Sequence, residues 1–487
     1  MHAAPSWARV LWVPAMRNDD HVAVDEGSVV IIGSGPGGYE AALVARQLGA
    51  PVTLIDRDGI GGSAVLTDCV PSKALIASAN AMNYVAESGD LGVLINGQPP
   101  QSAQLCVNLA TVNTRVKELA QAQSNDVKQS LIDQGVTIIE GSGSFIDQNT
   151  VHITRADGTT TEVHADVALI ATGARPRIMD TAIPDGERIL TWDQIYDLNE
   201  LPEKLIVVGS GVTGAEFASA YQGLGSKVVL VSSRDRVLPG EDEDAARVIE
   251  SVFERRGITV MSHSRAASAI RTETGVDVTL TDGQVIHGSH VLLALGSVPN
   301  TDGLNLEAVG VHLDDRGFIE VDKVSRTNSR TIYAAGDCTG VLMLASVAAM
   351  QGRIAMWHAL GDAVAPIELN TVSSTIFTEP EIAAVGVSQK DLDAGILRGE
   401  VVMLHLESNA RAKMQEQKDG FIKIFCRRSS RIIAGAVVVS PHASELIHPL
   451  TLAINERLTV DELASTFTVY PSLSGSIAEA ARRLHLQ

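Results

Sequence analysis

One local pattern occurs twice in this chain, and it restricts the possible fold more than any other feature. An aliphatic run at 29–32 leads into GSGPGG at 33–38, and a second run at 205–208 leads into GSGVTG at 209–214. The residues that follow each loop favour a helix. A strand, a glycine-rich turn and a helix are typical of a unit that holds a dinucleotide pyrophosphate at the helix N-terminus. The repeat therefore predicts two nucleotide-binding units far apart in one chain.

The two units differ where their second predicted strand ends. The strand at 52–55 is followed by Asp56, whose carboxylate can accept hydrogen bonds from a ribose diol. The strand at 228–231 is followed instead by Ser232, Ser233 and Arg234. An acid at this point would repel a 2′-phosphate, whereas hydroxyl groups and a guanidinium can receive it. We expect the second unit to accept NADPH without excluding NADH, unless Arg234 is merely a solvated loop residue.

Length and charge narrow the class of protein. A chain of 487 residues predicts two to four domains. Its formal charge of −20 argues against nucleic acid or anionic membrane as a partner. Residues 1–26 are expected to form a disordered extension. Their apolar stretch is too short to span a bilayer, so a membrane anchor is not expected there. No other run approaches about 18 uninterrupted apolar residues, so stable membrane insertion is not expected.

The cysteines indicate a compartment. Four of them, at 69, 106, 338 and 426, are too few and too scattered for a disulfide framework or a CxxC metal site. We therefore predict no metal, and we expect a cytoplasmic protein, where thiols stay reduced.

The segment at 61–73 reads GGSAVLTDCVPSK. It resembles the redox-disulfide helix of the flavoprotein disulfide reductases, whose pattern is G-G-T-C-x-N-x-G-C-x-P-S-K. Ala64 stands where the first cysteine belongs, and only Cys69 remains. Further segments at 170–176, 293–300, 331–337 and 376–386 resemble later motifs of that family in the same order. The resemblance covers roughly residues 28–485.

This resemblance implies an α/β fold with two Rossmann-like domains of the glutathione-reductase type and an α+β C-terminal dimerisation domain. The FAD domain would comprise 27–175 and 300–365, the NAD(P) domain 176–299, and the dimerisation domain 366–487. The implied functional unit is a homodimer.

The resemblance also assigns the cofactor residues. Those implied for FAD are Gly33, Gly35, Pro36, Gly38, Asp56, Arg57, Gly62, Ser63, Lys73, Gly143, Thr172, Gly173, Asp337 and Ala345. Those implied for NADPH or NADH are Gly209, Gly211, Gly214, Glu216, Ser233, Arg234 and Gly296. Ser297 stands where the family usually carries arginine, so details of the nicotinamide site stay open.

One half of the family's chemistry is retained. Lys73 and Glu216 match a lysine–glutamate pair beside flavin N5, where a cation stabilises the reduced flavin and the acid positions the lysine. The alternative is a purely structural salt bridge between domains.

The other half is missing. The family's His-Pro-x-x-x-Glu segment moves protons to and from the thiols, and here Tyr470 and Gly475 replace its histidine and glutamate. Tyrosine is a poor base at neutral pH. Together with Ala64, these changes predict no disulfide reductase activity.

Electrons must then leave to a diffusible acceptor. The substitution pattern resembles that of mycobacterial-type NAD(P)H:quinone reductases in this family, so we expect a quinone. Tyr470 could stack on the quinone or donate a hydrogen bond to it. The candidate catalytic residues are Lys73, Glu216, Tyr470 and Cys69, although Cys69 could be a charge-transfer donor, a bystander or inert packing.

Several alternatives stay open. They are a soluble transhydrogenase, a lone-cysteine disulfide or peroxide reductase that uses Cys69, a mercuric reductase, and a non-enzymatic flavin-binding module. No Ser-Phe-x-x-Cys setting surrounds Cys69, and no cysteine follows Cys426. These absences weigh against the lone-cysteine and mercuric reductases.

Overall fold

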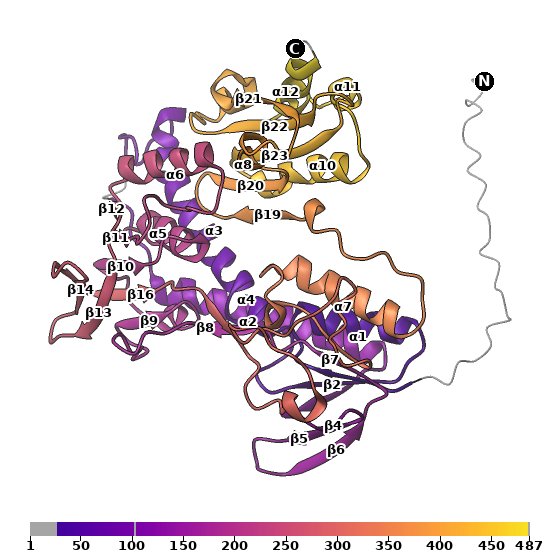
Figure 1. Ribbon diagram of the computed structural model, residues 1–487. Helices are drawn as coiled ribbons and strands as arrows, with labels where there is room; N and C mark the ends of the chain where they lie inside the picture. Colours follow the sequence, from indigo (N-terminus) through magenta and orange to yellow (C-terminus); the bar gives the residue numbers. More distant parts are fainter. Residues whose placement is uncertain (1–26, 102–103, 486–487) are drawn as a thin grey trace, which may run out of the picture.

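The computed structural model describes residues 27–101 and 104–485 (Figure 1). The N-terminal extension expected at 1–26 lies outside these described residues. The first glycine loop belongs to a five-stranded parallel sheet with the order β18-β7-β1-β2-β3. Its strands are β1 (Val29–Ile32), β2 (Val52–Asp56), β3 (Thr137–Glu140), β7 (Val167–Ile170) and β18 (Ile332–Ala334).

Both faces of this sheet are covered, as its continuous aliphatic strands require. One face packs against α1 (Pro36–Gln47) and α7 (Ala345–Ala359), which lie side by side (Figure 1). The other face packs against a three-stranded antiparallel sheet and the loop around 304–319. The strands of that small sheet are β4 (Ser142–Asp147), β5 (Thr150–Thr154) and β6 (Thr160–His164).

The second glycine loop belongs to a sheet of the same design, with the order β12-β11-β10-β16-β9. Its strands are β9 (Ile189–Thr191), β10 (Lys204–Val208), β11 (Lys227–Val231), β12 (Thr259–Met261) and β16 (His290–Leu293). A second three-stranded antiparallel sheet covers one face, formed by β13 (Ala266–Arg271), β14 (Val276–Leu280) and β15 (Val285–Gly288). The predicted duplication is confirmed, and each unit also has a small antiparallel sheet, inserted before β7 in the first unit and before β16 in the second.

The chain crosses between the two units twice. The crossing segments pair as β8 (Ala174–Pro176) and β17 (Ser297–Pro299) in an antiparallel ladder. After the second crossing the chain returns to the first sheet as its edge strand β18.

Residues after 372 form an antiparallel sheet with the order β19-β20-β23-β22-β21. Its strands are β19 (Ser373–Ile376), β20 (Glu381–Gly386), β21 (Gly399–His405), β22 (Phe421–Arg427) and β23 (Ile433–Ser440). It carries α10 (Ala443–Asn455), α11 (Val460–Ser465) and α12 (Gly475–His485) at the C-terminal end of the chain. This α+β unit agrees with the predicted fold class.

Strand β22 contains a charged residue that is buried. Lys423 on β22 is only 3% exposed, because both faces of this sheet are covered. Its Nζ donates to Asp242 at 2.9 Å and to Asp244 at 2.8 Å, both at the start of α6 (Glu243–Arg255). Lys423, a residue type usually found at the surface, thus links the third sheet to the second nucleotide-binding unit.

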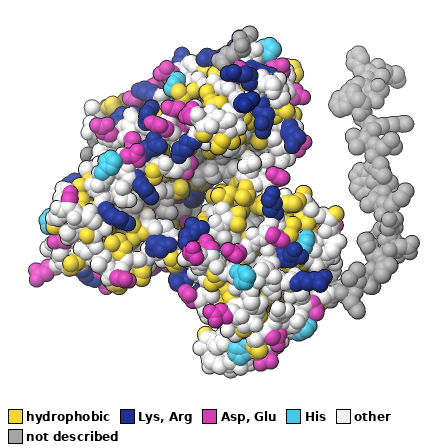
Figure 2. All heavy atoms as spheres, viewed as in Figure 1, with side chains coloured by type: hydrophobic (Ala, Val, Ile, Leu, Met, Phe, Trp, Pro, Cys, Tyr) yellow, Lys and Arg dark blue, Asp and Glu magenta, His cyan; other side chains and the backbone are white. Residues whose placement is uncertain are grey.

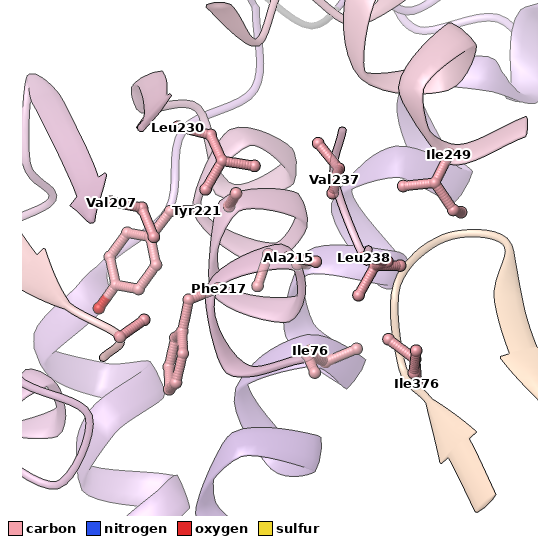
Figure 3. Packing of buried hydrophobic residues seen from close by; sticks show 14 of the residues in the cluster. Ile76, Val207, Ala215, Phe217, Tyr221, Leu230, Val237, Leu238, Ile249 and Ile376 are labelled. Atoms are coloured by element: carbon pink, nitrogen blue, oxygen red, sulfur yellow. The ribbon is translucent and has the colours of Figure 1, made fainter. Parts of the chain in front are cut away.

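One hydrophobic cluster joins all three parts and positions the site. In Figure 3, Ile76 from α3 (Cys69–Glu87) lies near Ala215 of α5 (Val212–Leu224), and Ile376 from β19 lies close by. Helix α4 (Leu109–Asp133) packs on the outer side of α3. Because α3 and α5 pack directly together, residues near their N-terminal ends are brought together across the two units. Within the described ranges, no helix is long and apolar enough to cross a membrane.

Candidate functional site

The two glycine loops have the geometry that their sequences predict. Gly33 and Gly209 have φ values of +101° and +115°, which favour glycine. A Cβ on Gly38 would lie 1.9 Å from the carbonyl oxygen of Gly33, and one on Gly214 would lie 1.8 Å from that of Gly209. These contacts explain why the first turn of each helix must contain a glycine at that position.

Most residues predicted to bind FAD line one cavity of about 440 Å³ at the carboxyl ends of the first sheet. They are Gly33, Gly35, Pro36, Asp56, Arg57, Gly62, Ser63, Thr172, Gly173, Asp337 and Ala345. Gly143 lines an adjoining cavity of about 500 Å³ that shares Asp56 and Arg57 with the first. Gly38 lies behind the loop. The short helix α2 (Gly62–Leu66) and the residues that follow it form part of the cavity wall, and Lys73 lies beside that wall.

The cavity residues fit an extended dinucleotide. The Cα of Gly35 faces open space, with nothing within 4 Å of a built Cβ, so a phosphate can approach the backbone. Burial, with a contribution from Asp68, raises the pKa of Asp337 to about 6, which suits a carboxyl group that pairs with hydroxyls. Bound FAD would supply hydride chemistry at its isoalloxazine ring.

Asp56 has a structural task as well as the predicted ligand-binding one. Its Oδ2 accepts hydrogen bonds from the Ser34 N–H and hydroxyl, both at 2.7 Å. Its Oδ1 accepts from the N–H groups of Asp58 and Gly59 at 2.8 and 2.9 Å. The carboxylate therefore holds the first glycine loop in place from the end of β2.

Lys73 and Glu216 meet as predicted. The Lys73 Nζ lies 3.0 Å from Glu216 Oε2, and the Glu216 side chain is 4% exposed. The backbone N–H of Phe377 donates to the second oxygen, Oε1, at 2.8 Å, and the Phe377 ring lies 4.9 Å from the lysine nitrogen. Burial lowers the pKa of Lys73, but the attraction of Glu216 outweighs it and the pKa is raised. Lys73 is thus a fixed cation at the cavity.

The surroundings of Cys69 favour the protonated, unreactive form of its thiol. It is the first residue of α3, a position that ordinarily favours a thiolate. Burial and the nearby carboxylate of Asp68 outweigh this effect and raise the pKa of Cys69 to about 12, although Lys73 acts in the opposite direction. Ala64 lines the same cavity and provides no second sulfur.

The end of β11 differs in part from the expectation. Ser233 and Arg234 are exposed, but Ser232 is fully buried. Its hydroxyl lies 2.7 Å from that of Ser210 in the second glycine loop and accepts from the Arg234 N–H at 3.1 Å. The expectation that both serines face a bound phosphate is therefore wrong for Ser232, because its hydroxyl holds the loop.

Tyr470 lies away from the cavity of its own chain. Tyr470 is 85% exposed, and its neighbours Phe467 and Val469 are also highly exposed. Within one chain the structure therefore brings Lys73, Glu216 and Cys69 together but leaves Tyr470 apart. Gly296 and the loop at 209–214 also lie outside the walls of the first cavity.

Sequence reasoning did not single out Asp68, Trp192 or Phe377. Asp68 carried a usable signal, since it stands at a glycine of the motif at 61–73. Trp192 follows β9 and reaches the cavity wall only through the packing of the two units. Phe377 acts through its backbone N–H, a group that nearly every residue has, so the sequence does not show which N–H will bind Glu216.

Comparison with known families agrees with this geometry. The family model described as "Pyridine nucleotide-disulphide oxidoreductase" matches residues 27–352, and the dimerisation-domain model of the same name matches residues 372–481. The chain belongs to this family of flavoprotein oxidoreductases, and the predicted family and fold class are confirmed.

Individual relatives narrow the comparison. The chain is 56% identical over 465 residues to "NAD(P)H dehydrogenase (quinone)" of Mycobacterium tuberculosis, covering 94% of this chain and 93% of that protein. It is 33% identical to a dihydrolipoyl dehydrogenase of Chlamydia pneumoniae, covering 94% and 96%. The crystal structure of LpdA from Mycobacterium tuberculosis superposes with a TM-score of 0.89 at 55% identity, covering 94% of this chain and 99% of that one.

Proposed function

We propose that this protein is an FAD-dependent NAD(P)H:quinone oxidoreductase that works without a redox-active disulfide. The observation that carries the proposal is the pairing of an intact Lys73–Glu216 contact with a cavity wall that holds Ala64 and a single thiol. The chain keeps the residues that would stabilise a reduced flavin and lacks those that would pass electrons to a disulfide. The name of the Mycobacterium tuberculosis relative supports a quinone as the acceptor.

Within this proposal, Lys73 presents its ammonium group to the flavin and stabilises the negative charge that reduction creates. Glu216 holds Lys73 in place and is itself held by the Phe377 N–H. The raised pKa of Cys69 argues against the lone-cysteine alternative, which needs a thiolate as nucleophile.

The experiment that tests the proposal is steady-state oxidation of NADPH and NADH by the purified, flavin-loaded protein. Menadione, benzoquinone, lipoamide, oxidised glutathione and oxygen are compared as acceptors at equal concentration. We expect turnover with the quinones and only background rates with lipoamide and glutathione. Lipoamide turnover equal to quinone turnover would refute the proposal. Ala64→Cys alone is not expected to restore it, since Tyr470 still replaces the base.

We also propose that the nicotinamide nucleotide binds over the loop at 209–214 and that NADPH binds at least as well as NADH. The exposed Ser233 and Arg234 support this assignment, because both can reach a 2′-phosphate at the end of β11. Ser232 is uncharged, so no negative charge at this strand end would repel a 2′-phosphate.

The proposed working unit is a homodimer in which Tyr470 lines the acceptor site of the partner subunit. The match to a dimerisation domain and the exposed apolar side chains of Phe467 and Val469 support it. Figure 2 shows hydrophobic side chains on both sides of the recess between the third sheet and α7. Met350, Ile354 and Trp357 of α7 line a cavity of about 580 Å³ in that part of the molecule.

We also propose the domain limits 175/176, 299/300 and 365/366 that the family resemblance implies. The ladder between β8 and β17, where the chain crosses between the two units, supports the first two. A reducing cytoplasm is the proposed location, supported by four cysteines that are unpaired in the structure.

A further inference from the structure

The proposed reaction leaves one proton without a source. Converting a quinone to a quinol adds two electrons and two protons, whereas a hydride carries two electrons and only one proton. The positions that handle protons in the family's disulfide chemistry are occupied by Tyr470 and Gly475 in this chain. A proton donor in the cavity wall would complete the reaction within the site.

Asp68 is a carboxyl group in the cavity wall that does not cap the helix it precedes. It stands where the motif at 61–73 has a glycine, and it lines the cavity beside Cys69 and Asp337. It also precedes α3, where an aspartate usually accepts a hydrogen bond from the first turn of the helix. Its backbone has φ −127° and ψ −94°, and its side chain makes no capping bond. A residue that could cap the helix leaves its carboxyl group at the cavity instead.

The surroundings of Asp68 favour the protonated form. Burial raises the pKa of Asp68, Lys73 lowers it, and Glu216 raises it further. An acid with a raised pKa keeps its proton at a higher pH than a surface aspartate, as a general acid must. The titratable groups that face Asp68 from its own and neighbouring elements are Cys69 and Lys73 on α3, Glu216 on α5, Tyr196 after β9 and Asp337 after β18.

Tyr196 provides a second observation at the same place. Its side chain is buried, with Ser72 and Asp68 near its hydroxyl. Burial first, and Asp68 second, raise the pKa of Tyr196 well above its ordinary value, so the phenol keeps its proton. A phenol that stays neutral does not compete with Asp68 as a proton donor.

We propose that Asp68 is the general acid of quinone reduction, an assignment that rests on the proposed function. The hydride that originates from NAD(P)H adds two electrons and one proton to the quinone. The O–H bond of the Asp68 carboxyl group breaks as its proton forms the second quinol O–H bond. The Asp68 carboxylate then recovers a proton from water. In sum, NAD(P)H, one proton and a quinone become NAD(P)⁺ and a quinol.

The test separates the two half-reactions by anaerobic stopped flow, using Asp68→Asn and Asp68→Glu. Flavin reduction by NADPH should stay within about twofold of the parent in both variants. Reoxidation by benzoquinone should fall at least tenfold in Asp68→Asn, consistent with the usual contribution of a general acid. In the parent this rate should decline as pH rises through the pKa of Asp68. That decline should vanish in Asp68→Asn and return in Asp68→Glu.

Asp193→Asn is the matched control. Asp193 lines the same cavity, but its carboxylate already accepts a hydrogen bond from the Thr191 hydroxyl at 2.5 Å. This variant should keep the pH-dependent decline in reoxidation. Loss of the decline in Asp193→Asn, or its persistence in Asp68→Asn, overturns the assignment of Asp68.

A second readout does not depend on turnover. Infrared difference spectra of the resting, oxidised protein across the acidic pH range should contain the carbonyl band of a protonated carboxylic acid. Because the pKa of Asp337 is raised as well, this band should contain contributions from both carboxyl groups, and Asp68→Asn should remove a part of it that Asp337→Asn retains. An identical band in Asp68→Asn contradicts the proposal.

The two levels of proposal fail in different ways. Absence of quinone reoxidation in the parent protein refutes the proposed function. Fast parent reoxidation with an unchanged pH profile in Asp68→Asn refutes only the role of Asp68.

Discussion

The two nucleotide-binding units share one backbone plan but hold their glycine loops with different chemistry. In the first unit, Ser34 donates two hydrogen bonds to the Asp56 carboxylate. In the second, the corresponding Ser210 is bonded to the hydroxyl of Ser232. A neutral hydroxyl pair therefore suffices to hold this loop. The Asp56 carboxylate also accepts hydrogen bonds from the N–H groups of Asp58 and Gly59, and we propose that its charge serves ligand recognition in addition.

This difference also separates the two ligands. Asp56 places a negative charge at the end of β2, which would repel a 2′-phosphate. Ser232 places none at the end of β11, and the exposed Arg234 adds a positive one. We therefore propose that the residues at these two strand ends distinguish the two nucleotides.

The sharpest test of the shared plan is to add a methyl group at the third glycine of each loop. Gly38→Ala should yield protein with little bound flavin, and Gly214→Ala should retain flavin but raise the NADPH dissociation constant more than tenfold. The reason is that each Cβ would overlap a carbonyl oxygen, at 1.9 and 1.8 Å respectively. Such overlap ordinarily costs about 1–3 kcal/mol. Flavin absorbance per protein and NADPH titration measure the two effects.

The control for this pair is Gly240→Ala, because a Cβ at Gly240 would meet nothing within 4 Å. It should leave both ligands bound as before. Retention of flavin in Gly38→Ala would show that the two loops are not equivalent.

A second experiment removes the contact that links the units. Lys73→Met should slow flavin reduction by NADPH about 100-fold, the range expected for loss of one preorganised electrostatic group. Glu216→Gln should be milder, since the Phe377 N–H can still hold the amide oxygen. Stopped-flow absorbance at the flavin band gives both rates. Equal losses in the two variants would contradict the assignment of the charge effect to Lys73.

A third experiment addresses the strand ends. Arg234→Ala should raise KM for NADPH about 10- to 100-fold and leave KM for NADH unchanged, as expected for loss of a charge-assisted hydrogen bond of about 1.5–3 kcal/mol. Ser232→Asp should disfavour NADPH in the same way by copying the first unit. Steady-state kinetics with both nucleotides measures the selectivity. An equal change for NADPH and NADH would show that Arg234 does not contact the 2′-phosphate.

A smaller effect is expected at the acceptor side. Tyr470→Ala should change KM for the quinone severalfold while leaving flavin reduction by NADPH nearly unchanged, because Tyr470 lies outside the cavity of its own chain. Loss of flavin reduction would assign Tyr470 to structural support. Full quinone activity in a monomer, tested by sedimentation, would remove the shared acceptor site.

The smallest expected effect concerns the pH dependence of the flavin-free protein. Its free energy of unfolding should decrease as pH rises from about 4 to about 6, because burial raises the pKa of Asp337 from 3.8 to about 6. Folding then favours the protonated carboxyl group, and this advantage is lost as the group ionises. Asp337→Asn should flatten this part of a thermal unfolding series. An unchanged slope would exclude Asp337 as its source.

The sequence was sufficient to predict the repeated units, the cavity loops and the Lys73–Glu216 contact, since each depends on local patterns with strict geometric requirements. Burial at Lys423 and Ser232 was not predictable, because it depends on which element packs against each strand. Phe377 was missed for a related reason, as its contribution is a backbone N–H. Asp68 was visible as a departure from the motif, but its significance required knowledge that it does not cap α3.

The Phe377 contact has a further consequence for how the protein matures. Glu216 belongs to the second nucleotide-binding unit, Lys73 to the first and Phe377 to the segment after β19, so three separately encoded stretches converge on one carboxylate. The last of these is synthesised some 160 residues after Glu216. A ribosome-bound chain that has completed only its first two units has Lys73 and Glu216 but lacks the Phe377 N–H that binds the second oxygen of Glu216. Completion of the redox centre therefore waits for the final part of the chain, which links electron transfer to finished folding.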